Sequence, residues 1–308
     1  MTELSPAHDA AVTDRGRLAG SAYNDDRYLA ALQSLYRWQT PRYDLPGMVG
    51  KQLSAIRRLV VDVGCGNGKF IKRLRQDRPD LSLLGLDIAA GILADVPGPV
   101  AVADASRLPL ATASADAALA LHMLYHVPDI AQTVKELSRV VTGEGPVIVS
   151  TNSERDKAEL NDLWVRAAGD VLGVARGPSR ISLSARFSLE KAPAFLGKEF
   201  SRVETIELPG TITVRDPEPV VAHMASYRAW ADLDARLLGI AAAPEVPLVR
   251  KRLALLRGDP IEEPKSGTPP GRGWQPRADP NPGFGAHWLQ TVVSPPAAKC
   301  REQRSPRL

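Results

Sequence analysis

The sequence predicts an α/β fold, in which a doubly wound, mainly parallel sheet carries inserted helical cap segments. Short β-rich runs alternate with helical stretches through residues 58–151, which is the order of a parallel sheet with crossover helices. The first run, residues 60–63, leads directly into a glycine-rich turn and a helical segment. A strand, a tight turn and a helix start in that order are typical of sites that bind nucleoside ligands.

The turn after this run reads Asp62-Val63-Gly64-Cys65-Gly66-Asn67-Gly68-Lys69. Glycine stands at every second position, and only glycine tolerates the unusual backbone angles and the close ligand approach that such a turn needs. A dinucleotide fingerprint reads G-x-G-x-x-G, whereas here the third glycine comes one residue early and Lys69 occupies the last slot. This spacing argues against a nicotinamide-dependent dehydrogenase.

The next two expected strands end on acidic residues. Residues 81–87 end on Asp87, which lies 19 residues after the last glycine of the turn. A carboxylate at the carboxyl end of strand two can accept hydrogen bonds from both hydroxyls of a ribose. Residues 100–105 form the third expected strand, which ends on Asp104 and Ala105.

Strands four and five complete the expected core. Residues 116–129 comprise strand four and the loop that follows it. Residues 129–141 show helical periodicity, with Asp129 as a plausible N-cap. Residues 145–151 form strand five after a turn that contains glycine.

Lid-like segments are expected before the core. Residues 1–20 are small, polar and unpatterned, which predicts a disordered N-terminus. Residues 22–57 are predicted as N-terminal lid helices, and much of the chain's aromatic content falls within 22–38. That stretch fits an amphipathic helix packed on the core, and it also fits a lid over a bound ligand.

Further helical segments are expected after the core. Residues 154–186 are charge-rich and helical, and they are longer than a plain connection requires, which predicts an inserted cap on the carboxyl face of the sheet. Core structure resumes over residues 187–208, with strand six at 202–208. Helical structure is expected again over residues 217–257, including a final helix at 246–257.

The C-terminal segment differs in composition from the rest. Residues 258–308 hold 10 prolines and 6 glycines, which predicts a disordered, basic tail. A closing seventh strand is doubtful, because the candidate at residues 287–293 is poor. Without such a strand one edge of the sheet would stay open, at a cost to stability and solubility.

The five core elements and their spacing resemble the class I S-adenosylmethionine-dependent methyltransferases, whose first motif is acidic-x-G-x-G-x-G. The loop after strand four resembles the type 11 subgroup, and the resemblance covers residues 45–210 closely. It implies a Rossmann-like methyltransferase fold over residues 21–257, with S-adenosylmethionine as the cofactor. It also implies that an antiparallel seventh strand closes the sheet.

The resemblance implies a role for each acidic residue at the strand ends. Asp62 reaches toward the methionine ammonium group, Asp87 binds the ribose, and Asp104 lies at the adenine edge. Each residue has a plainer alternative, since Asp62 could hold the turn, Asp87 could cap a helix and Asp104 could form a turn. The full set of expected cofactor contacts is Asp62, Gly64, Cys65, Gly66, Asn67, Gly68, Asp87, Ile88, Asp104, Ala105, Leu121 and His122.

The need for a general base depends on the acceptor. If a hydroxyl is methylated its proton must leave, and histidine is the usual agent near neutral pH. His126 and His122 follow strand four at the mouth of the site and are the candidate catalytic residues, although both could pack or cap instead. His223 is a weaker candidate, and an acceptor that is already nucleophilic needs no base.

Composition limits the remaining possibilities. With 308 residues, 44% of them hydrophobic, the chain can bury a core, and neither a membrane-length apolar run nor a signal-peptide pattern is recognisable. The two cysteines, Cys65 and Cys300, predict no disulfide framework and no metal site, and they favour a cytoplasmic location. The net charge is +4, but residues 248–308 carry 11 Lys or Arg against 5 Asp or Glu, so the basic excess is assigned to the tail.

The sequence leaves three functions open. The first is methyl transfer to a small-molecule acceptor, such as a secondary metabolite, by in-line displacement. The second is RNA methylation, which the basic tail favours. A nucleic-acid partner is nevertheless disfavoured, because residues 121–124 replace the Asp/Asn-Pro-Pro-aromatic signature and no cysteine is placed for catalysis. The third is a non-catalytic protein that binds S-adenosylmethionine. The choice between monomer and homodimer also stays open.

Overall fold

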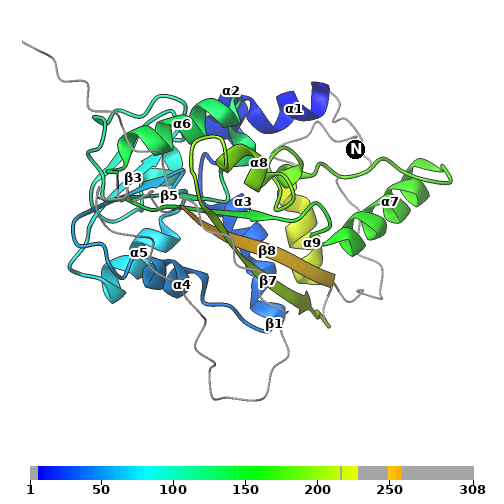
Figure 1. Cartoon of the computed structure of the whole chain (residues 1–308). Coiled ribbons are helices and arrows are strands. Elements are labelled where there is room, and N and C mark those ends of the chain that lie inside the picture. The colour runs from blue at the N-terminus through cyan, green and yellow to red at the C-terminus, as the bar shows by residue number, and fades with distance from the viewer. Residues whose placement is uncertain (1–5, 144, 216, 228–248, 259–308) are drawn as a thin grey trace, which may run out of the picture.

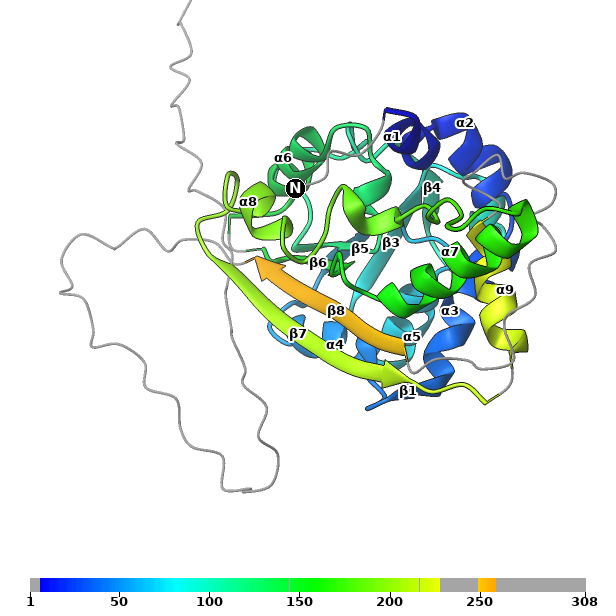
Figure 2. The same ribbon diagram turned by 90° about the vertical axis from the view of Figure 1, so that its right-hand side faces the viewer.

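The computed structural model describes residues 6–143, 145–215, 217–227 and 249–258. Within these ranges the chain forms an eight-stranded sheet with helices on both faces (Figures 1 and 2). Its order is β1-β7-β8-β6-β5-β2-β3-β4, which confirms the predicted α/β class. The strands are β1 (Gln39–Thr40), β2 (Leu59–Val63), β3 (Ser82–Asp87), β4 (Val100–Val102), β5 (Ala117–Leu121), β6 (Val147–Asn152), β7 (Val203–Ile212) and β8 (Val249–Gly258).

The parallel half of the sheet is β6-β5-β2-β3-β4. From β2 the chain runs outward through β3 to β4, and it then returns to place β5 on the other side of β2. Connections diverge at this reversal and leave a crevice at the carboxyl ends of the strands, where open α/β sheets bind ligands. The glycine turn leaves β2 at this point.

The antiparallel half of the sheet corrects two predictions. β8 lies between β6 and β7 and is antiparallel to both, so residues 249–258 form a strand rather than the predicted helix. This strand closes the sheet, and the alternative candidate at residues 287–293 lies outside the described part of the chain. Leu255 and Leu256 are both buried, and they belong to the two hydrophobic clusters on opposite faces. A strand buried on both faces lacks the polar–apolar alternation that identifies most strands, so its short apolar run also fits a helix.

Helices cover both faces of the sheet. Figure 1 shows α6 and α8 on one face, and α4 and α5 on the other. Asp129 caps α6, because its carboxylate accepts a hydrogen bond from the Gln132 N–H at 2.9 Å, as the N-cap prediction requires. The helices, including short 3-10 and π turns labelled η, are α1 (Pro6–Thr13), α2 (Arg15–Arg17), η1 (Leu18–Ala22), α3 (Arg27–Ser34), η2 (Leu35–Trp38), α4 (Leu45–Gln52), α5 (Lys69–Asp77), η3 (Gly91–Leu93), η4 (Leu124–His126), α6 (Ile130–Val140), α7 (Ala158–Leu172), η5 (Leu183–Ala185), α8 (Ala192–Leu196) and α9 (Glu218–Ser226).

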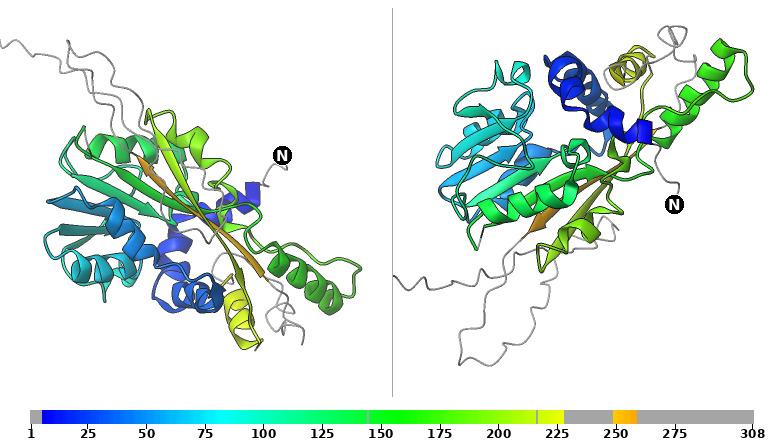
Figure 3. Two further views of the ribbon diagram at one scale, coloured as in Figure 1. Left: turned by 60° about the horizontal axis from the view of Figure 1, so that its bottom comes forward. Right: turned by 90° about the horizontal axis from the view of Figure 1, so that it is seen from above.

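The N-terminal segment is ordered where it is described. The prediction of disorder over residues 1–20 is wrong for residues 6–20, which form α1, α2 and most of η1. Val12 and Leu18 are buried, so this short stretch contributes apolar side chains to the molecule despite its polar composition. The right-hand view of Figure 3 shows the blue N-terminal helices beside the cyan strands of the core.

The segment after β6 forms a separate helical layer. α7 is shorter than the predicted 154–186 helical stretch and ends at Gly173, which adopts a left-handed φ of 70°. Apolar side chains of α7 pack against η2 and α9, including Leu163, Leu35 and Met224. The predicted helix at 217–240 is described only as far as residue 227, as α9, and its remainder lies outside the described residues.

Candidate active site

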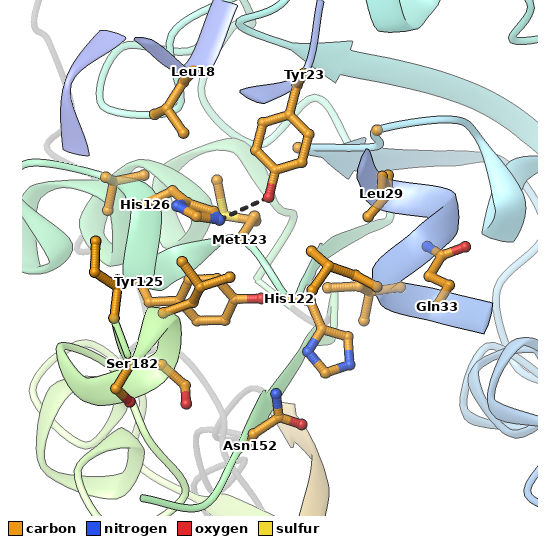
Figure 4. Close-up of a pocket in the computed structure, with 18 of the residues that line it drawn as sticks. Leu18, Tyr23, Leu29, Gln33, His122, Met123, Tyr125, His126, Asn152 and Ser182 are labelled. Carbon is orange, nitrogen blue, oxygen red and sulfur yellow. Dashed lines mark hydrogen bonds between the residues drawn. The ribbon is translucent and has the colours of Figure 1, made fainter. Parts of the chain in front are cut away.

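A cavity of about 500 Å³ opens at the carboxyl ends of the parallel strands. One part of its wall, here called the strand end, is formed by the glycine turn and by residues that follow β3, β4 and β5. The other part, here called the helical end, is formed by side chains of η2, α7, α9 and residues 179–184. Figure 4 shows side chains of the N-terminal segment, the β5 loop and β6 converging on this space.

All of the predicted cofactor contacts except Gly68 line the cavity. Gly68 lies behind the wall as the N-cap of α5, with φ 68°, and a Cβ there would come within 2.5 Å of a Val96 methyl carbon. Gly64 has φ 70°, and a Cβ there would lie 2.7 Å from the Cβ of Met123. The turn therefore needs glycine at both positions for its backbone angles and for space.

Asp62 presents a buried carboxylate that has no hydrogen-bond partner on either oxygen among the described residues. Burial, together with the nearby charge of Asp87, raises the pKa of Asp62 to about 8. An orphaned carboxylate of this kind is stabilised by a cation, and S-adenosylmethionine carries an ammonium group. The residue thus fits the group that the resemblance assigns to it.

Asp87 ties β3 to the glycine turn. Its carboxylate accepts hydrogen bonds from the Gly66 N–H at 2.9 Å and the Ala89 N–H at 3.0 Å. Burial raises the pKa of Asp87, and these backbone bonds oppose the rise. Each carboxylate oxygen can accept more than one bond, so Asp87 retains acceptor capacity for ribose hydroxyls while it holds the turn.

Asp104 makes more hydrogen bonds and ion pairs than the sequence suggested. It accepts hydrogen bonds from the Ser106 N–H at 2.9 Å and hydroxyl at 2.7 Å, and it forms an ion pair with Arg15 of α2. Burial acts to raise the pKa of Asp104, but the bonds from Ser106 and the neighbouring charge of Arg15 bring it below its ordinary value. Asp104 therefore also anchors the N-terminal segment to the strand end.

His126 is buried and hydrogen-bonded through both ring nitrogens. Nδ1 lies 3.0 Å from the Val12 carbonyl oxygen, and Nε2 lies 2.9 Å from the Tyr23 hydroxyl (Figure 4). A carbonyl can only accept, so Nδ1 carries the hydrogen and Nε2 accepts from Tyr23. Burial lowers the pKa of His126 to about 4, so the ring is neutral at pH 7.

These bonds restrict the predicted role of His126 as a general base. Its basic nitrogen, Nε2, already accepts a hydrogen bond from the Tyr23 hydroxyl. A proton from the methyl acceptor would therefore have to reach His126 through that hydroxyl. His122 follows β5 with a left-handed φ of 57° and lines the cavity together with Gln33 and Asn152 (Figure 4). His223 lies in the wall of the helical end, and burial lowers its pKa well below the ordinary value.

Several side chains in the cavity were not singled out from the sequence. Tyr23 is the hydrogen-bond partner of His126, but in the sequence it is only one of several aromatic residues within 22–38. Lys157 and Arg180 line the helical end, in the stretch predicted as an inserted cap. The charge-rich composition of that stretch was the available signal, but it could not tell which charges face inward.

Residues 61–149 match a family model described as a methyltransferase domain. These residues form a methyltransferase domain, and the match supports the predicted resemblance to the class I S-adenosylmethionine-dependent methyltransferases of the type 11 kind. It is 32% identical over 138 residues to malonyl-acyl-carrier protein O-methyltransferase of Hahella chejuensis, a match that covers 40% of this chain and 50% of that protein. It is 28% identical over 148 residues to tRNA (carboxymethyluridine(34)-5-O)-methyltransferase of Arabidopsis thaliana, covering 44% and 36% respectively. The chain thus spans half or less of these relatives.

A solved structure shares the fold of this protein. It is a putative methyltransferase from an antibiotic biosynthesis pathway of Anabaena variabilis, with a TM-score of 0.51 at 14% identity. The match covers 68% of this chain and 95% of that one. Within the described part of this chain, no three His, Cys, Asp or Glu side chains are grouped as metal ligands would be. Nor does any helix described here have the length and apolar character to cross a membrane.

Proposed function

We propose that this protein transfers a methyl group from S-adenosylmethionine to a small-molecule acceptor, such as a secondary metabolite, by in-line displacement. The observation that carries the proposal is the shared cavity. Its strand end holds the orphaned carboxylate of Asp62, and its helical end supplies a second set of polar side chains within the same space. A volume of about 500 Å³ is in the range of small-ligand sites.

The strand end would hold the cofactor, which when bound supplies a methyl group activated on a sulfonium. Asp62 would pair with the ammonium group, and Asp87 would accept from the ribose hydroxyls. Asp104 and Ala105 would border the adenine. Backbone N–H groups of the turn before α5 would face the methionine carboxylate, since a helix N-terminus favours negative charge.

Proton removal would pass through Tyr23 where the acceptor is a hydroxyl. Tyr23 lines the cavity and donates its hydrogen to His126, so its hydroxyl oxygen would meet the hydroxyl of the methyl acceptor as a hydrogen-bond acceptor. His126 holds that orientation, and it is itself fixed by the Val12 carbonyl. With a pKa of about 4, His126 is a weak base. Tyr23 and His126 would therefore act chiefly by positioning the methyl acceptor.

RNA is the second candidate acceptor, because one relative is a tRNA methyltransferase. The test offers the protein S-adenosylmethionine with two separate pools, a small-molecule extract and total RNA from the same cells. Formation of S-adenosylhomocysteine is followed by mass spectrometry, with Asp87→Ala as the control that should lose activity. We expect product with the small-molecule pool. Product with RNA alone would establish the second candidate, and binding of the cofactor without turnover in either pool would support a non-catalytic role.

A further inference from the structure

Arg180 is a half-buried side chain in the helical end of the cavity. Its Nη1 atom is buried and has no hydrogen-bond partner among the described residues. The guanidinium carbon lies 4.6 Å from the centroid of the Tyr227 ring, so an aromatic face supports the planar group. The Arg180 backbone N–H donates to Asn161 Oδ1 at 3.3 Å, which ties this segment to α7. The guanidinium is therefore held in place, yet one of its nitrogens is unused.

The neighbouring charges at this end do not neutralise Arg180. Lys157 forms an ion pair with Asp156, and both side chains are almost fully buried. Glu154 forms an ion pair with Lys191, in which Oε1 and Nζ are 2.8 Å apart. Asp162, on α7, is exposed. Among the described residues of the helical end, Arg180 is the cation whose charge is not matched by an ion pair.

We propose that Arg180 binds a carboxylate of the acceptor, so that the substrates of this site are carboxylate-bearing small molecules. The inference rests on the proposed function, because it requires an acceptor in the helical end beside the cofactor. A buried guanidinium N–H without a partner is unfavourable, and a ligand oxygen would satisfy it. The planar group can donate two parallel hydrogen bonds to the two oxygens of a carboxylate.

The charge balance distinguishes a carboxylate from a phosphate. One unmatched positive charge equals the single negative charge of a carboxylate, whereas a phosphate monoester would bring a second charge without a partner. The carboxylate acts as an anchor and is not itself methylated. Arg180 belongs to the helical end while the glycine turn belongs to the strand end, so a different nucleophilic atom of the acceptor faces the cofactor.

Matched pairs of ligands test this proposal directly. Hydroxylated aromatic and aliphatic carboxylic acids, beginning with 4-hydroxybenzoate, are titrated beside their primary amides into protein saturated with S-adenosylhomocysteine. A phosphate analogue, 4-hydroxyphenyl phosphate, provides the dianionic comparison. We expect at least one carboxylate to bind about 10-fold or more tightly than its amide. Arg180→Gln should reduce this preference to within about twofold, and Arg180→Lys should retain part of it.

The control is Arg176→Gln, which removes an exposed arginine from the same segment and should keep the full preference. The affinity for S-adenosylhomocysteine should be unchanged in Arg180→Gln, which shows that this variant is folded. The proposal is wrong if no carboxylate exceeds its amide, if Arg180→Gln keeps the preference, or if the phosphate binds most tightly. Failure of the wild-type protein to bind S-adenosylhomocysteine would instead overturn the proposed function.

Discussion

The two ends of the cavity are built in different ways. The strand end comes from one part of the chain, between the glycine turn and the loop after β5, in which backbone turns and strand ends place Asp62 and Asp87 around the glycine turn. The helical end comes from η2, α7, α9 and residues 179–184, which are far apart in the sequence and meet through side-chain packing. A cofactor site encoded locally can be inferred from sequence, whereas an acceptor site assembled from distant segments cannot.

The two ends also differ in charge. Carboxylates dominate the strand end. The buried Asp62 and the half-buried Asp87 have raised pKa values, because removal from water disfavours their charged form. The helical end holds a compensated lysine–aspartate pair and an uncompensated guanidinium. A cationic cofactor and an anionic acceptor would each find a complementary charge, and variants of either end should therefore have separable effects.

The largest expected effect is at the glycine turn. Gly64→Ala places a methyl group 2.7 Å from Met123 Cβ at a left-handed φ of 70°. The turn must shift, so we expect unfolding free energy to fall by about 2–4 kcal/mol and cofactor affinity to fall by about 100-fold. Thermal denaturation and calorimetric titration with S-adenosylhomocysteine measure the two quantities.

Gly173→Ala is the matched control for this variant. Gly173 ends α7 with the same φ of 70°, but no heavy atom lies within 4 Å of an added Cβ. It should cost about 1–2 kcal/mol of stability through its backbone angle and leave cofactor affinity unchanged. Equal effects of the two substitutions on cofactor affinity would show that the glycine turn does not depend on the close approach of Met123 to Gly64.

A smaller effect is expected from Asp62→Asn, with opposite signs for binding and stability. Loss of the charge should weaken cofactor binding by about 10- to 100-fold. The folded-state pKa of about 8 lies above the ordinary 3.8, so Asp62 favours folding when protonated and this contribution is lost as the pH rises from about 4 to 8. The free variant should therefore exceed wild type in Tm at pH 8–9, and the difference should shrink toward pH 4.

Exposed Asp95 lies outside the cavity and offers the control for that substitution, because Asp95→Asn should leave the affinity for S-adenosylhomocysteine unchanged. A Tm of free Asp62→Asn below that of wild type at pH 8–9 would mean that the Asp62 carboxylate is stabilised by a partner in the free protein. The orphaned carboxylate would then no longer support a cation-binding role.

The smallest of these effects concerns Tyr23. Tyr23→Phe removes the hydroxyl that donates to His126, so we expect kcat for an identified acceptor to fall by about 10-fold. The affinity of the variant for S-adenosylhomocysteine should stay within about twofold of the wild-type value, since His126 and Tyr23 act on the methyl acceptor. Tyr43→Phe is the control, because the Tyr43 hydroxyl donates to the Pro209 carbonyl outside the cavity. An unchanged kcat would remove Tyr23 from the mechanism.

The sequence allowed the parallel core to be predicted because its strands, turn and capping residue are defined by local patterns, as Asp129 illustrates. β8 was missed because a strand buried between two others shows no alternation, and its pairing depends on residues about 40 to 110 positions earlier. Four of the basic residues assigned to the tail, Arg250, Lys251, Arg252 and Arg257, lie on this strand. The Tyr23–His126 bond could not be foreseen either, since it joins residues 103 positions apart.

The most direct test of the central claim is a calorimetric titration of wild type and Asp87→Ala with S-adenosylmethionine, S-adenosylhomocysteine and NAD. We predict micromolar binding of the first two to wild type and affinity reduced by about 10-fold or more in the variant, because a charged hydrogen bond to a buried ribose is lost and the glycine turn loses its carboxylate acceptor. Binding of NAD alone, or equal affinity of both proteins for S-adenosylmethionine, would contradict the account.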